Sequence, residues 1–150
     1  MFTVSLLMVV VGALLGVLDS AHRTQSFVYD RADALDEMRL TLDRMTKEVR
    51  QAGSVALDST ASRLEVSTYV GGEPETIVYE VSGTDLVRSV DGGQYTVVHE
   101  KVASSDLFQY EPAVETAQVV KMVLRVHPSN SPDTTLELSS EVQLRNRGSA

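Results

Sequence analysis

The sequence predicts an α+β fold in which one long N-terminal helix packs the second half of its length on an antiparallel β-sheet. Three observations lead to this prediction. No charged side chain occurs from Met1 to Leu18, and neither proline nor glycine interrupts residues 17–52. After Gly53, the apolar residues change from the three-to-four spacing of a helix to the alternation of a strand.

The first element is an uncharged run, Phe2–Leu18, that is apolar at almost every position. At about 1.5 Å per residue it gives a helix of roughly 26 Å, close to the bilayer core of about 30 Å. We therefore expect residues 1–22 to be a retained single-pass membrane anchor, with the remainder of the chain outside the cytoplasm. A cleaved signal peptide is the alternative, although no basic residue precedes the run and no small-residue cleavage motif follows it.

The second element, residues 23–52, continues the same helix as an amphipathic segment of the domain 23–150. Its apolar positions recur at every seventh residue with others between them, which marks one helical face. We expect this face to pack on the sheet through Leu35, Met38, Leu42, Met45 and Val49, with Val28 and Ala52 on the same line. Arg39 and Glu48 lie on other faces, where substitution by alanine is expected to change stability by only about 0.5 kcal/mol. A coiled coil is the alternative for this segment.

The third element is a β-sheet expected over residues 55–146. Alternating or β-branched segments predict strands at 63–69, 76–81, 85–90, 95–100, 119–126 and 135–145. Asp91-Gly92-Gly93 predicts a tight hairpin turn, and Gly53 a helix C-cap. We expect one face of a single antiparallel sheet to be covered by the helix and the other to face solvent or a neighbour.

Composition excludes several classes of function. The net charge of −8 argues against direct nucleic-acid binding, and the absence of cysteine excludes disulfides and thiolate sites. The three histidines share no metal-ligand spacing: His22, His99 and His127. An every-fourth-residue acidic series reads as a solvated strand face: Asp133, Glu137 and Glu141. No catalytic or nucleotide-binding motif occurs, so we expect neither an enzyme nor a cofactor.

The opening run Met1-Phe2-Thr3-Val4-Ser5-Leu6-Leu7-Met8-Val9-Val10 resembles the start of a mature type IV pilin or pseudopilin. Later segments resemble the minor branch of that family, the PilW-like minor pilins or the J-type minor pseudopilins of type II secretion. These segments are residues 42–52, 77–81, 85–88, 107–110 and 142–146. The resemblance covers nearly the whole chain through the order of these pieces, and it implies a pilin-like arrangement of helix and sheet.

The resemblance implies a structural subunit of a type IV pilus or a type II secretion pseudopilus, in a priming or tip complex. Implied partners are other pilin or pseudopilin subunits, the membrane, assembly platform proteins and a prepilin peptidase. The residues implied in the filament core are Phe2, Leu6, Leu7, Val10, Gly12, Gly16 and Leu18, and Gly12 with Gly16 permits close helix approach. Ser5 stands where most of the family has a glutamate, which implies either a special position, such as a tip subunit with nothing above it, or a different register, although a one-residue shift places Leu6 at the acid site. The alternatives are a signal-anchored extracytoplasmic binding or sensor domain that does not polymerise, and an exported domain whose first helix is removed.

Overall fold

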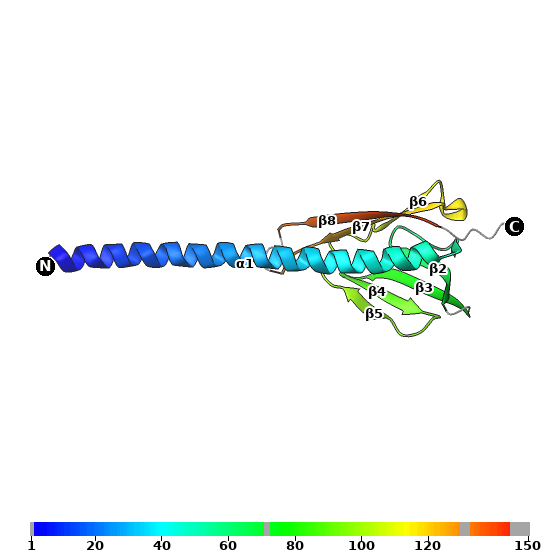
Figure 1. Cartoon of the computed structure of the whole chain (residues 1–150), viewed down its shortest axis with the longest axis horizontal. Helices are drawn as coiled ribbons and strands as arrows, with labels where there is room; N and C mark the ends of the chain where they lie inside the picture. Colours follow the sequence, from blue (N-terminus) through cyan, green and yellow to red (C-terminus); the bar gives the residue numbers. More distant parts are fainter. Residues whose placement is uncertain (1, 71–72, 130–132, 145–150) are drawn as a thin grey trace.

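A computed structural model describes residues 2–70, 73–129 and 133–144, without the side chains of residues 2–7, 9, 10, 23 and 70. One helix, α1 (Phe2–Gln51), is followed by short and medium strands (Figure 1). The strands are β1 (Ser54–Val55), β2 (Arg63–Val70), β3 (Glu73–Ser82), β4 (Asp85–Val90), β5 (Thr96–His99), β6 (Phe108–Glu111), β7 (Val119–Val126) and β8 (Leu136–Gln143). A 3-10 turn, η1 (Val114–Thr116), lies between β6 and β7.

The strands form two antiparallel sheets, so the prediction of a single sheet is wrong, although the broad α+β class agrees with the structure. The first sheet has the order β1-β2-β3-β4-β5, and the second has the order β6-β7-β8. The chain leaves the first sheet after β5, and β6 begins the second sheet instead of extending the first. Alternation along a strand predicts which side chains share a face, but it does not predict which strands are neighbours.

Helix α1 lies between the two sheets and contacts both, through β8 and β7 on one side and β2 and β5 on the other (Figure 1). The C-terminal part of the helix supplies one stripe of the hydrophobic core, which both sheets complete. Met38, Leu42, Met45 and Val49 are buried there, and Leu35 packs against the same core as a half-buried residue.

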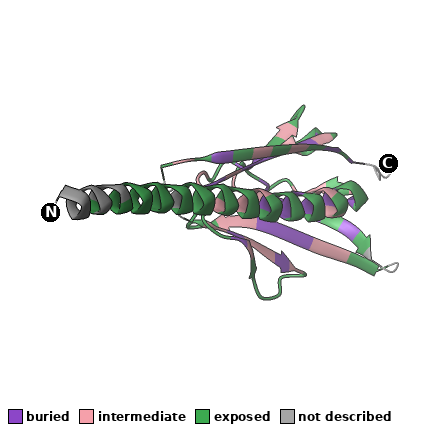
Figure 2. Ribbon diagram, turned by 60° about the vertical axis from the view of Figure 1, so that its left-hand side comes forward, coloured by how far each residue is buried: buried purple, intermediate pink, exposed green. Residues whose placement is uncertain are grey.

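The N-terminal part of α1 projects beyond both sheets as a helical arm, which we define as residues 11–33 (Figure 2). The helix runs without interruption through residues 19–26, where the arm approaches the sheets. Val28 continues the apolar line of the core stripe but is 57% exposed, because the sheets end before they reach it. Arm and body therefore share one continuous helical rod.

The predicted membrane anchor needs correction. Among the residues that the structure describes, no helix contains a stretch long and apolar enough to cross a membrane. The single-pass anchor over residues 1–22 and the membrane localisation that followed from it are therefore not supported.

The turn between β4 and the segment leading to β5 has the geometry that the sequence predicts. Asp91 and Gly92 both have positive φ, 50° and 68°, and the Gly93 N–H donates to the Val90 carbonyl over 2.8 Å. These are the features of a type I′ turn, which favours aspartate followed by glycine. The Asp91 carboxylate also accepts a 2.7 Å bond from the Thr76 N–H, so this turn is fastened to β3.

Candidate functional site

The exposed arm of α1 is the candidate functional site. Eight large apolar side chains lie exposed on it: Val11, Leu14, Leu15, Val17, Leu18, Phe27, Val28 and Tyr29. Scattered apolar residues on a protein surface are ordinary, but a contiguous exposed group marks a place where another molecule binds. We take the arm as a surface for association.

One face of the arm carries no charge over four turns. Val17, Ala21, Thr24 and Val28 follow the same three-to-four spacing as the core stripe, and Leu14 begins the series. Asp19 lies about 200° around the helix from Ala21 and belongs to the opposite side. The uncharged face ends at Arg31, just before the sheets begin to cover the helix. We call the surface of Leu14, Val17, Ala21, Thr24 and Val28 the uncharged face.

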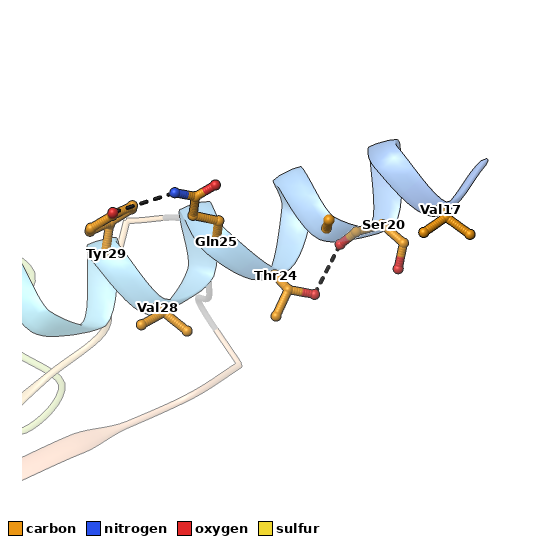
Figure 3. A pocket seen from close by; sticks show the side chains of 7 residues that line it. Val17, Ser20, Thr24, Gln25, Val28 and Tyr29 are labelled. Carbon is orange, nitrogen blue, oxygen red and sulfur yellow. Dashed lines mark hydrogen bonds between the residues drawn. The ribbon is translucent and has the colours of Figure 1, made fainter. Parts of the chain in front are cut away.

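The middle of the uncharged face is shallow because its residues are small. A groove there is lined by Val17, Ser20, Ala21, Thr24, Gln25, Val28 and Tyr29 (Figure 3). The Thr24 hydroxyl donates to the Ser20 carbonyl over 2.9 Å, so its polar group is satisfied within the helix and its methyl group remains for packing. Small residues between larger ones allow a second helix to approach closely.

The structure places the predicted filament-core residues in two groups. Gly12, Gly16 and Leu18 lie on the arm, where Leu18 is exposed and a Cβ atom added at either glycine would meet nothing within 4 Å. Nothing described in this chain packs against these glycines. The other predicted residues, Phe2, Ser5, Leu6, Leu7 and Val10, lie outside the described side chains.

A charged cluster that the sequence analysis missed fixes the packed half of the helix to the first sheet. The Glu48 carboxylate accepts a 2.6 Å bond from the Tyr79 hydroxyl and two 3.0 Å bonds from Arg88, and Arg44 lies 3.3 Å away on the helix. The side chains of Glu48 and Arg88 are only 19% and 15% exposed. The expectation that Glu48 lies on a solvated face is therefore wrong, and no sequence signal links it to strands 31 and 40 residues away.

This cluster perturbs the acidity of its members. Burial raises the pKa of the Tyr79 phenol well above its ordinary value, and the adjacent Glu48 carboxylate raises it further. Burial alone would lower the pKa of the Arg88 guanidinium, but its bonds and attraction to Glu48 outweigh burial and raise that pKa. Both shifts favour the protonated forms, in which Tyr79 and Arg88 donate to the Glu48 carboxylate and hold the helix against β3 and β4.

The polar residues near the base of the arm do not form a metal centre. Within the described ranges, no three histidine, aspartate or glutamate side chains gather closely enough to hold a metal ion. His99 and His127 each contact a backbone carbonyl through Nδ1, at 2.7 Å from Glu100 and 3.2 Å from Thr134. His22 is exposed on the arm, away from both.

No protein-family model, curated protein or solved structure matches this chain.

Proposed function

We propose that this chain is a structural, non-catalytic subunit of a filament of the type IV pilus or type II secretion pseudopilus kind. In this proposal it is a minor pilin or pseudopilin of a priming or tip complex, and its arm packs against helices of other pilin-like subunits. The single observation that carries the proposal is the uncharged face, an exposed surface that extends the line of the buried core stripe along the arm.

The physical case rests on apolar burial. Full burial of one valine or leucine side chain stabilises an association by about 1.5–3 kcal/mol. The uncharged face offers Leu14, Val17 and Val28 together, and Phe27 lies beside it. Because the arm is already helical, association does not also have to order its backbone, which reduces the cost that these contacts must offset.

The rigidity of the arm supports the same proposal. The uninterrupted helix carries the arm out of the body, and the Glu48 cluster fastens its other end to β3 and β4. When neighbouring subunits bind along such a rod, the body of this subunit has a fixed orientation relative to its neighbours. A flexible tether would leave the body free to turn, which suits a sensor better than a filament subunit.

A charge placed on the uncharged face tests the proposal. We expect Ala21→Lys to reduce the copies of this subunit per isolated filament by at least about tenfold, because a buried unpaired ammonium costs several kcal/mol. Asp19→Lys, on the opposite side of the same helix, is the matched control and is expected to leave the copy number within about twofold. Quantitative mass spectrometry of filaments sheared from the producing cells gives the count.

Two results would contradict the proposal. One is that the wild-type and Ala21→Lys chains are present in equal copy number per filament when the cells contain equal amounts of both. The other is the absence of the wild-type chain from purified filaments of cells that make it.

A further inference from the structure

The outer edge of β8 presents backbone groups that no other strand of the described residues pairs. The N–H of Leu144 donates to the carbonyl of Gln118 over 3.0 Å, and these two residues continue the register in which Gln143 lies opposite Val119. In an antiparallel ladder, residues that bond directly to their opposite partner alternate with residues whose groups point away from it. The even-numbered residues of β8 therefore bond to β7.

The alternate set, Glu137, Ser139, Glu141 and Gln143, points its N–H and C=O groups to the open edge. The other side of β7 agrees with this assignment, because its odd-numbered residues bond away from β8. Val123 N–H donates to the Leu107 carbonyl, and the Arg125 carbonyl accepts from Ala103, both over 2.8 Å. Among the described residues, no backbone bond reaches β8 from beyond its open edge.

The edges formed by β5 and β6 are protected. The register of β5 is shifted opposite Leu86 and Val87, and the Val98 carbonyl accepts a bond from Thr41 of the helix. The N–H of Phe108 in β6 donates to the Ala61 carbonyl. Shifts, short length and covering groups are the usual protection of strand edges. By contrast, β8 spans eight residues in regular register with β7.

The charges on the outer face indicate which strand fits this edge. On that face β7 carries Lys121 and Arg125, and β8 carries Glu141 and Glu137 opposite them. Arg125 and Glu137 form an ion pair of 2.6 Å, with the glutamate side chain 55% exposed. Opposite charges across strands stabilise a sheet and like charges destabilise it. On this face β7 is basic and β8 is acidic, so a basic strand beside β8 would continue the alternation of charge.

We propose that the β8 edge is a docking site for an extended strand of a partner protein that carries Lys or Arg at alternate positions. The strand would bond to the outward backbone groups of β8 and place its cations beside Glu137 and Glu141. A second copy of this chain fits poorly, because pairing through the same edge brings two acidic strands together. The inference is independent of the proposed role of the arm.

Synthetic peptides test this docking site on the full chain. The probe is the labelled peptide Thr-Lys-Val-Lys-Val-Lys-Val-Thr. A second, acidic peptide has Glu at each Lys position, and a third is the basic peptide with its backbone N-methylated at alternate residues. Fluorescence anisotropy gives the affinities. We expect the basic peptide to bind at least about tenfold more tightly than either other peptide, because only it supplies both charge and backbone donors.

Charge-reversed variants complete the test. The double variant Glu137→Lys/Glu141→Lys is expected to prefer the acidic peptide, while Glu73→Lys/Glu115→Lys, two reversals elsewhere, keeps the wild-type preference. Equal binding of the N-methylated and unmethylated basic peptides would overturn strand addition in favour of simple charge attraction. Absence of binding by any peptide would also overturn it. A dimer of the chain that the basic peptide dissociates would show that a second copy occupies this edge, and would overturn it as well.

Discussion

Glu48 of the helix bonds to two strands of the first sheet and helps to fix the position of that sheet against the helix. Its two carboxylate oxygens accept bonds from Tyr79 on β3 and from Arg88 on β4, two neighbouring strands. Hydrogen bonds to a charged group contribute about 1.5–3 kcal/mol each when they are sheltered from water. Without the carboxylate, the Arg88 guanidinium and the Tyr79 hydroxyl lose that acceptor while they remain half-buried.

We therefore expect Glu48→Ala to lower the free energy of unfolding by about 2–3 kcal/mol. Glu48→Gln keeps an acceptor but removes the charge, so its loss should be smaller. Asp43→Ala, an exposed acidic position on the same helix, is the control and should change stability by no more than about 0.5 kcal/mol. Urea unfolding followed by circular dichroism measures all three, and equal losses for Glu48→Ala and Asp43→Ala would contradict the role given to the cluster.

At the scale of the element, helix α1 has two environments along one uninterrupted length. From Leu35 to Ala52 its apolar stripe lies between two sheets, and before Ala34 the same line of residues is exposed. The difference is set by the sheets and not by the helix, because the spacing is the same in both halves. The packed half is held by burial, whereas the arm is held only by its own backbone bonds and its continuity with the packed half.

Leu42 and Leu40 give a matched comparison within this helix. Leu42 is 6% exposed and Leu40 is 72% exposed, two residues apart. We expect Leu42→Ala to destabilise the fold by about 2–5 kcal/mol, because it leaves a cavity in the core. Leu40→Ala should change stability by less than about 0.5 kcal/mol. The midpoints of denaturant unfolding compare the two, and similar losses would mean that the helix packs on another face.

Much of the element structure could be predicted, since local pattern determines it. The helix ends at Gln51, and strands are present in each of the six predicted segments. The predicted Gly53 cap is wrong, because Gly53 does not have a positive φ and its N–H donates to the Ser67 carbonyl of β2 over 2.9 Å. The strands β1 and β6 were missed because segments of two and four residues are too short to show alternation. The second sheet and the Glu48 cluster could not be predicted, because both depend on which distant segments become neighbours.

The membrane anchor was predicted from the length of the uncharged run Phe2–Leu18. It is not supported, because no helix among the described residues is long and apolar enough to cross a membrane. The uncharged face of the arm carries no charge, whereas Asp19 and Asp33 lie on other sides together with exposed apolar residues such as Leu15 and Tyr29. An uncharged exposed face suits packing against other helices, and the proposal of a filament subunit rests chiefly on that face.

At the scale of the whole molecule, a two-sheet body holds one end of a long helix and leaves the other end outside (Figure 2). An exposed rod with one uncharged face has its clearest use in association with other rods. The body then carries separate surfaces, of which the β8 edge is one. The central claim of this account is that the uncharged face of the arm is buried in the assembled state.

Cysteine cross-linking tests that claim most directly, because the chain contains no cysteine of its own. Ala21→Cys and Asp19→Cys place single thiols on the two sides of the arm, about 200° apart. Cells producing each variant are treated with a short bis-maleimide, and the products are identified by mass spectrometry. Each variant is produced together with a pilin-like chain that carries a cysteine on its own helix. We predict that Ala21→Cys gives a product cross-linked to that chain and that Asp19→Cys does not. Cross-linking of Asp19→Cys equal to or greater than that of Ala21→Cys would contradict the claim.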